Sequence, residues 1–172
     1  MRTSGIAAAA ILFLAGSAFA ADAPDDAQIA SIVVTANQVD IDAGKLAQSN
    51  GSNPEVKAFG KQMVTDHTAV NKQAVALVKK LKVTPQDNPT SQSLKSGGTE
   101  NVKSLKKLQG AAFDSAYIEH EIAYHAQVID AIKQTLIPNA KNDELKQLLM
   151  TGLTLFEGHL EHAKQIQSAL GK

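Results

Sequence analysis

The stretch NPEVKAFGKQMVTDHT most restricts how this chain can fold, because it begins like a helix and continues at a helical spacing. Asn53 is a preferred N-cap residue, and Pro54 suits the first helical position. Apolar residues then recur every three or four positions, which predicts an amphipathic helix over residues 54–82. One position on its apolar stripe, near the middle of the helix, is His67. A histidine inside a predicted core needs a compensating partner.

Three other segments show the same spacing and predict helices over residues 26–50, 111–136 and 142–170. Pro138 lies beyond the third of them, and Gly171 follows the fourth. No segment alternates like a strand. Four amphipathic helices of similar length predict an all-α fold, a four-helix bundle.

The connection from Val83 to Gly110 is rich in Pro, Ser, Asn and Gly, which predicts a long loop. Val102, Leu105 and Leu108 indicate a short helix within it. Long connections are unusual inside a compact domain, and a connection that must run the whole length of the bundle explains one. We therefore expect a crossover between the second and third helices, with those two helices running parallel.

The first 20 residues have the pattern of a secretory signal peptide. Arg2 precedes an apolar run from Ile6 to Leu14, and Ala18-Phe19-Ala20 is a cleavage site of the small-x-small type. Cleavage after Ala20 leaves residues 21–172 as a single helical domain, and the periplasm is the expected location. Later segments are too short and polar to span a membrane. The sequence has no cysteine, so a lipid-anchor cysteine and disulfides are excluded.

The formal net charge is zero, with 17 basic and 17 acidic residues interspersed along the chain. This balance gives no electrostatic basis for binding nucleic acid. Nothing in the sequence names a protein partner or an oligomeric state.

Each predicted helix carries one metal-competent residue on its apolar stripe, close to its own midpoint. These residues are Asp40, His67, His125 and His159. Midpoints of packed helices share a level, so the four side chains are predicted to converge in one core layer. Three imidazole nitrogens and a carboxylate oxygen suit Zn, Mn, Fe or Cu(II). A mutual hydrogen-bond network is the alternative, and a small helix rotation would put Asp40 in solvent.

Other polar residues near this layer are weaker candidates for the site. Glu121 lies one turn before His125 and is a further ligand, a supporting partner or a pair for a lysine. Met63 would favour copper as a ligand but is otherwise core, and His162 is expected at the rim. Two aspartates either orient imidazoles or support helix packing: Asp66 and Asp114.

Common enzyme patterns are missing from the sequence. His120-Glu121 precedes His125 by five residues rather than the four of a zinc-protease motif, and no Glu lies three residues before any His. No nucleophile elbow or phosphate loop occurs. The sequence therefore leans away from an enzyme, and a catalytic oxidase is not expected.

Three blocks of this chain resemble the bacterial family called domain of unknown function 4142, whose members are often labelled predicted outer membrane proteins. The blocks are SNPEVKAFGKQMVTDHT, LQGAAFDSAYIEHEIAYHAQVI and LFEGHLEHAKQI. The resemblance covers residues 32–170 and implies an exported, ferritin-like helical bundle without a settled activity. The family pattern usually has Glu where this chain has Asp40, and it otherwise carries over onto Asp66, His67, Phe113, Asp114, Tyr117, His125 and His159.

Two functions follow as hypotheses. The first is a periplasmic bundle that binds one transition-metal ion in its core for storage, buffering or stress protection. The second is a non-catalytic structural or interaction protein of the cell envelope, in which the histidines form only a hydrogen-bond network. A redox or hydrolytic enzyme at the same site is a third, weaker reading. Imidazole nitrogens within about 4 Å of a common point would favour metal, and ring separations near about 10 Å would exclude it.

Overall fold

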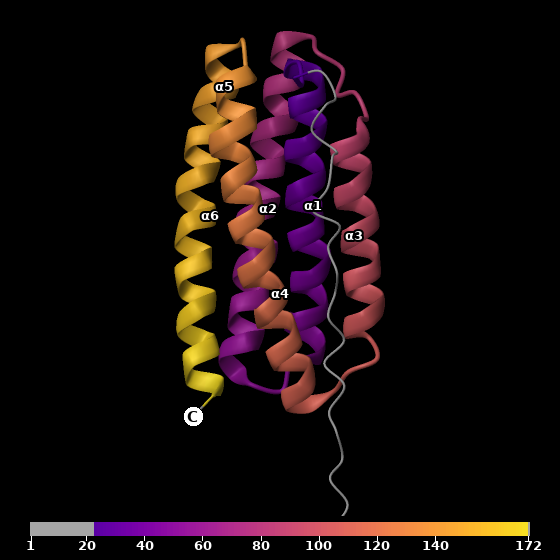
Figure 1. The fold of residues 1–172 in the computed structure, drawn as a ribbon, viewed down its shortest axis with the longest axis vertical. Helices are drawn as coiled ribbons and strands as arrows, with labels where there is room; N and C mark the ends of the chain where they lie inside the picture. Colours follow the sequence, from indigo (N-terminus) through magenta and orange to yellow (C-terminus); the bar gives the residue numbers. More distant parts are fainter. Residues whose placement is uncertain (1–22, 172) are drawn as a thin grey trace, which may run out of the picture.

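The computed structural model describes residues 23–171, and that part of the chain is all-α, with no strand. The signal-peptide prediction for residues 1–20 lies outside the described residues. Five long helices lie side by side along one axis (Figure 1). They are α1 (Asp26–Asn50), α2 (Pro54–Leu81), α3 (Pro89–Leu105), α4 (Gly110–Ala131) and α6 (Asp143–Leu170). Helices α1, α3 and α6 run in one direction, and α2 and α4 run in the other (Figure 1).

Side-chain caps fix the starts of three helices where the sequence predicts them. Asp25 forms a capping box with Gln28 at the start of α1. Asn53 accepts from the Glu55 N–H at the start of α2, and Asn142 caps α6 in the same way. Because each cap satisfies N–H groups that have no partner within the helix, the boundaries stay within one residue of the predicted ones.

The predicted long loop between residues 83 and 110 is wrong, because most of it forms the 17-residue helix α3. Asn88 and Ser91 form a capping box, and Pro89 occupies the first turn. The segment lies along α1, where a Cβ on Gly98 would come within 2.7 Å of Val39. Packing against α1 therefore outweighs the low helix propensity of its Gly and Ser residues. This helix returns the chain along the bundle before α4 begins (Figure 1).

The end of the third predicted helix also differs from expectation. Beyond α4 the chain continues as a π-helix, η1 (Ile132–Leu136), and a short α5 (Ile137–Asn139), so Pro138 lies inside the helical segment rather than beyond it. The Ile137 N–H bonds to the Ile132 carbonyl five residues earlier. Proline has no N–H to bond to the carbonyl four residues before it, so the helical ladder is interrupted next to this wider turn.

The core consists of two apolar clusters separated along the bundle axis by a polar layer. One cluster includes Val39 of α1 and Phe156 of α6, and the other includes Ala43 and Ala163 of the same helices. Between them, in sequence, lie Asp40 on α1, His67 on α2, Glu121 on α4 and His159 on α6. The polar layer therefore lies at the waist of the bundle, at the level the helix midpoints predict.

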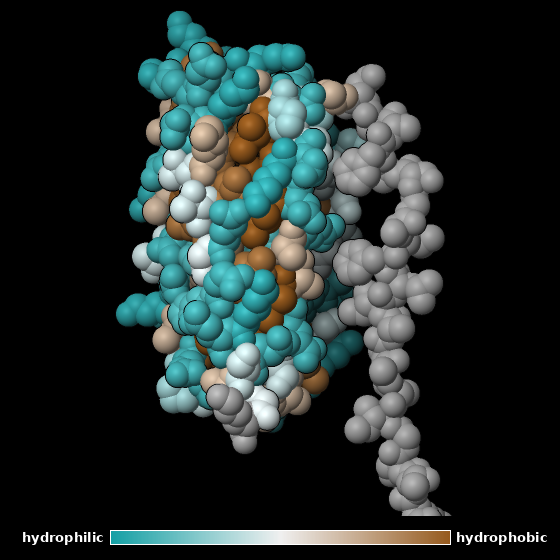
Figure 2. Space-filling view, turned by 60° about the vertical axis from the view of Figure 1, so that its left-hand side comes forward, coloured by the Kyte–Doolittle hydropathy of each residue, from teal (hydrophilic) through white to brown (hydrophobic). Residues whose placement is uncertain are grey.

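Helices α1 and α2 form the most extensive contact in the fold. A Cβ on Gly60 would come within 2.8 Å of both Ala47 Cβ and the Gly44 carbonyl oxygen, so only glycine permits this close approach. The face shown in Figure 2 is mostly hydrophilic, with a lengthwise strip of hydrophobic side chains. None of the helices within residues 23–171 is both long and apolar enough to cross a membrane.

Candidate metal centre

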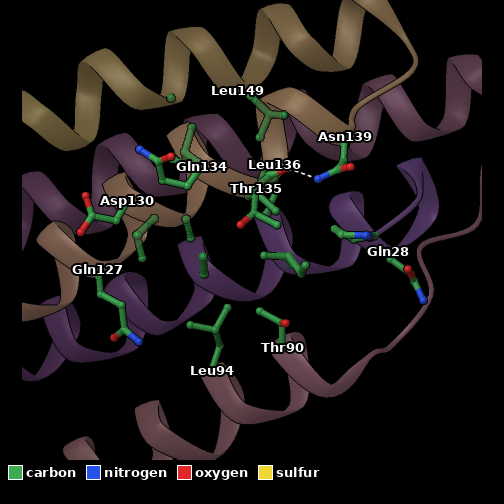
Figure 3. Close-up of a pocket in the computed structure, with 18 of the residues that line it drawn as sticks. Gln28, Thr90, Leu94, Gln127, Asp130, Gln134, Thr135, Leu136, Asn139 and Leu149 are labelled. Carbon is green, nitrogen blue, oxygen red and sulfur yellow. Dashed lines mark hydrogen bonds between the residues drawn. The ribbon is translucent and has the colours of Figure 1, made fainter. Parts of the chain in front are cut away.

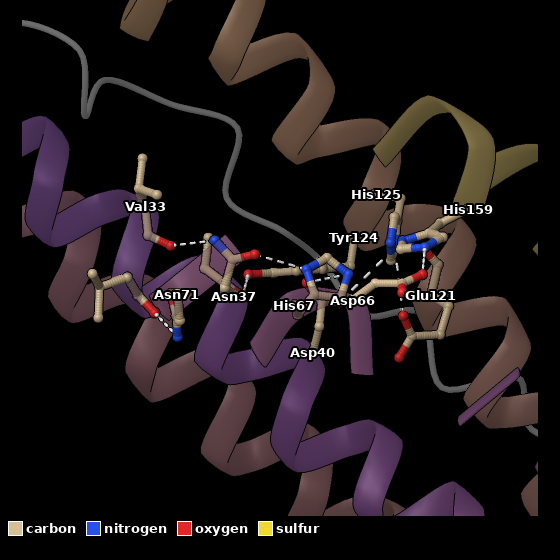
Figure 4. A network of polar contacts seen from close by, with 12 residues as sticks. Val33, Asn37, Asp40, Asp66, His67, Asn71, Glu121, Tyr124, His125 and His159 are labelled. Atoms are coloured by element: carbon tan, nitrogen blue, oxygen red, sulfur yellow. Dashed lines mark hydrogen bonds and ion pairs between the residues drawn. The ribbon is translucent and has the colours of Figure 1, made fainter. Parts of the chain in front are cut away.

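Three imidazole rings from three helices meet in the polar layer (Figure 4). His67 of α2, His125 of α4 and His159 of α6 are all buried. Ring centroids lie 5.8 Å apart for His67–His125, 5.1 Å for His67–His159 and 5.6 Å for His125–His159. One ring nitrogen from each residue lies within 4.8 Å of the others. Any three atoms that close have a common point no more than about 2.8 Å from each of them, and a Zn–N bond measures about 2.0–2.1 Å.

The orientation of His67 is fixed by Asn37 of α1 (Figure 4). The Asn37 side-chain amide donates to the Val33 carbonyl at 2.7 Å, so its Oδ1 is free to accept. Nδ1 of His67 lies 2.8 Å from that Oδ1 and must donate to it. This hydrogen bond leaves a lone pair on Nε2 of His67, which has no hydrogen-bond partner within residues 23–171.

The other two rings follow the same arrangement. Nδ1 of His125 lies 2.9 Å from the main-chain oxygen of Glu121 and donates to it. Nε2 of His159 donates to Asp66 Oδ2 at 2.9 Å. Nε2 of His125 and Nδ1 of His159 then carry lone pairs that lack partners in the described chain. Metal-binding histidines characteristically donate their second N–H to an outer oxygen acceptor, as all three rings do here.

Two carboxyl groups complete the cluster. Asp40 Oδ2 lies 3.6 Å from Nε2 of His67, and both oxygens of Asp40 are buried without a partner in the described residues. Glu121 is buried one turn before His125, and its carboxyl oxygens likewise lack partners. Asp40 therefore faces the core, rather than the solvent position that a rotated helix would have given it.

Asp40, Glu121 and His125 form a second group of candidate ligands that shares His125 with the first. Nδ1 of His125 lies 3.4 Å from Glu121 Oε2 and 4.0 Å from Asp40 Oδ1. That nitrogen already donates its proton to the Glu121 carbonyl, so it offers no lone pair on this side. The three imidazoles are therefore the better donor set, with Asp40 3.6 Å from His67 and Glu121 one turn before His125.

Burial keeps the three rings neutral. Burial first, and then His125 and His159, lower the pKa of His67 to about 2. Burial and His159 lower the pKa of His125 to about 3, against the opposing effect of its bond to the Glu121 carbonyl. Burial also lowers the pKa of His159, although Asp66 acts in the other direction. Neutral imidazoles are the form that binds a metal ion.

The two carboxyl groups shift in the opposite direction. Burial and the negative charge of Glu121 raise the pKa of Asp40 well above its usual range. Burial also raises the pKa of Glu121. Both groups therefore tend to keep their protons until a cation is present to stabilise their charge.

Of the two aspartates predicted to support the site, one contacts an imidazole of the cluster and the other does not. Asp66 accepts a hydrogen bond from His159 and orients its ring, which is one of the two roles considered for it. Tyr117 is buried one turn before Glu121, and burial, Glu121 and Asp40 raise its pKa. Asp114 accepts from the N–H groups of Ser52 and Asn53 at 2.9 and 2.8 Å. It therefore fixes the turn between α1 and α2 and does not contact an imidazole of the cluster.

Two other candidates lie away from the cluster. Met63 packs in the apolar cluster that contains Phe59, which agrees with its core reading. His162 lies at the side of the bundle, where Nδ1 is 3.1 Å from Gln62 Oε1 and the ring meets Phe59 edge-on. Within residues 23–171, His162 does not belong to either group of candidate ligands.

Two important residues were missed by sequence reasoning. Asn37 is buried and precedes Asp40 by one turn, a spacing that could have drawn attention to it. Phe156 lies with its ring centroid 4.9 Å from His67 and 5.0 Å from His125. As one apolar residue among many on its helix, Phe156 carried no distinguishing signal.

A comparison with known protein families finds a match that covers most of the chain. The family described as "Domain of unknown function (DUF4142)" matches residues 14–166. No curated protein matches the chain, and no solved structure matches it.

Proposed function

Because the chain belongs to the DUF4142 family, whose description names no activity, we propose a function from the buried cluster itself: the protein binds one transition-metal ion in its core. His67, His125 and His159 supply three nitrogen ligands, and Asp40 supplies an oxygen ligand. Glu121 lies beside this set and balances its charge.

The observation that carries the proposal is the state of the three ring nitrogens. Each imidazole uses one N–H on an outer acceptor, and its other nitrogen is buried without a partner in the described part of the chain. Leaving one buried polar atom unpaired costs about 1–3 kcal/mol. Three such nitrogens beside two unpaired carboxyl groups are costly unless a shared cation binds them.

A hydrogen-bond network is less consistent with this arrangement. A network would pair the inner nitrogens with one another or with Asp40, but none of them has a hydrogen-bond partner within residues 23–171, and Nε2 of His67 lies 3.6 Å from Asp40 Oδ2. That distance exceeds a hydrogen bond. The structural and interaction role that this alternative implies therefore has less support than metal binding.

The donor set favours a metal of intermediate softness. Imidazole nitrogen with one carboxylate suits Zn, Cu, Fe or Mn, and the sequence has no cysteine to supply sulfur. Zn is the best fit, because three nitrogens and one oxygen make a common tetrahedral shell.

We further propose that the bundle is ferritin-like and acts in the periplasm in metal storage, buffering or stress protection. The parallel course of α2 and α4, joined by a connection along the bundle, supports this arrangement (Figure 1). The apolar run and small-residue site at residues 6–20 support export and a single domain over residues 21–172.

Metal analysis of the purified protein tests the proposal. About one equivalent of a transition metal is expected, or Zn-dependent thermal stabilisation of the metal-free protein. His159→Ala should abolish both effects. The matched control is His162→Ala, one turn along α6, which should retain them because His162 faces Gln62.

Two results would contradict metal binding. One is less than a tenth of an equivalent of any transition metal together with no stabilisation by Zn, Cu, Mn or Fe. The other is a His159→Ala variant that loses stability while its metal content stays unchanged, as the hydrogen-bond network predicts.

A further inference from the structure

A cavity of about 1030 Å³ lies beside the metal centre. Its walls come from α1, α2, α3, α4, η1, α5 and α6 (Figure 3). Its size is at the upper end of the range for small-molecule sites, which measure about 300–1,000 Å³.

The inner wall of this cavity is also the wall of the metal centre. Asn37, which orients His67, lines the cavity. Phe156, whose ring packs against both His67 and His125, lines it too. Val70, one turn after His67 on α2, also lines the cavity. A molecule in the cavity would therefore contact the side chains that hold the imidazoles in place.

Gly152 shows that this part of the core contains open space. It is buried and lines the cavity, yet a Cβ built on it would meet no atom within 4 Å. Protein interiors are normally close-packed, so a buried backbone facing open space marks a real void. The adjacent π-helix η1 supplies Ile132, Thr135 and Leu136 to the wall. Such π-helical turns occur frequently at functional sites.

The walls define the chemistry of a ligand. Apolar side chains such as Leu94, Leu136 and Leu149 are joined by uncharged polar groups such as Gln134 and Asn139 (Figure 3). Among the residues of 23–171 that line the cavity, the only one of a charged type is Asp130, and none is Lys or Arg. With no cation to pair with an acid, the walls disfavour an anionic ligand.

We propose that this cavity binds a small, uncharged and largely apolar molecule next to the metal centre. The proposed binding site depends only on the cavity. The effect of a bound molecule on a metal ion also depends on the proposed function, and a separate experiment tests it.

The first experiment uses metal-free protein and the neutral fluorescent probe N-phenyl-1-naphthylamine, whose emission rises in apolar surroundings. Saturable binding is expected, with displacement by decan-1-ol and at least about tenfold weaker displacement by decanoate. Gly152→Leu should weaken probe binding by about tenfold or more, because its side chain fills the void. Gly158→Leu is the matched control on α6, since Gly158 is exposed and also has room for a side chain.

Both variants gain helix propensity, so loss of folding is not the expected outcome. No saturable probe binding, equal displacement by decanoate, or equal effects of the two variants would overturn the proposal.

The second experiment uses Co²⁺-loaded protein. Adding decan-1-ol should shift the visible absorption bands of the metal in wild-type protein but not in Gly152→Leu. Probe binding without a spectral shift would show that the cavity is separate from the metal centre. Failure to bind Co²⁺, with probe binding intact, would contradict only the proposed function.

Discussion

Nε2 of His67 lies 3.6 Å from Oδ2 of Asp40, and neither atom has a hydrogen-bond partner within residues 23–171. Nδ1 of His67 is held by Asn37, so Nε2 presents a lone pair to the carboxyl group. Two such acceptors facing one another in a buried layer need a positive charge between them. Burial and Glu121 raise the pKa of Asp40, so its carboxyl group tends to hold a proton, which a metal ion would replace.

Metal binding should therefore release protons, and the carboxyl groups rather than the imidazoles should be their source. Burial raises the pKa of Glu121 to about 8 and also raises that of its neighbour Asp40, which favours a proton on this carboxyl pair at pH 7. His67 and His125, with pKa values of about 2 and 3, are already neutral. Zn added to weakly buffered metal-free protein at pH 7 should acidify the solution. Asp40→Asn should reduce the release, and the exposed control Asp42→Asn should not. Equal release from both variants would assign the protons to another group.

The raised pKa of Asp40 also predicts how stability depends on pH. Between its unfolded value of 3.8 and its raised folded value, the folded protein binds more protons than the unfolded chain. The free energy of unfolding therefore falls as pH rises through that window. Asp40→Asn removes this loss, so in the presence of EDTA the variant should gain stability over wild type from pH 4 to pH 8. The histidine contributions act in the opposite direction but are the same in both proteins.

Thermal unfolding followed by circular dichroism at pH 4, 6 and 8 measures the effect. The melting temperature of Asp40→Asn should exceed that of wild type by a few degrees at pH 8 and match it near pH 4. Asp42→Asn should show no such trend, because Asp42 is exposed. A difference between Asp40→Asn and wild type that does not vary with pH would show that Asp40 is charged in the folded protein.

Much of the fold could be predicted because its signals are local. Asn53 and Pro54 fix a helix start through backbone groups within one turn, and the apolar spacing fixes which face is buried. Helix α3 could not be predicted in this way. Its Gly97 and Gly98 oppose a helix locally, and the contact of Gly98 with Val39 that favours it joins residues far apart in sequence.

The same distinction applies to the site. His67, His125 and His159 interrupt apolar stripes, so their burial and common level could be predicted from helix geometry. Which acceptors His67 and His159 use could not be predicted, because Asn37 and Asp66 reach those two rings from neighbouring helices. Which of two polar residues on a helix faces a ring depends on helix rotation, and sequence spacing does not fix that angle.

Asp66 should contribute to metal affinity without binding the ion. It accepts the Nε2 proton of His159, which directs the lone pair of Nδ1 into the cluster. Removing such an outer acceptor typically lowers metal affinity about 10- to 100-fold. Competition with a chelating Zn indicator should show this loss for Asp66→Ala, and little change for the exposed control Asp42→Ala. Unchanged affinity in Asp66→Ala would mean that His159 does not bind the ion through Nδ1.

Gly60 should control both the stability of the bundle and the assembly of the site. A Cβ at this position would come within 2.8 Å of Ala47 Cβ and of the Gly44 carbonyl oxygen, so Gly60→Ala forces α1 and α2 apart. Overpacking of this kind costs about 1–3 kcal/mol. Because α1 carries Asp40 and α2 carries His67, Zn affinity should fall together with stability.

Gly158→Ala is the control for Gly60→Ala. The Cβ at position 158 meets nothing within 4 Å, and this variant should gain roughly 0.5–1 kcal/mol from helix propensity. Urea unfolding of both variants, with and without Zn, measures the two effects, and a Gly60→Ala protein as stable as Gly158→Ala would show that the helices do not pack this closely.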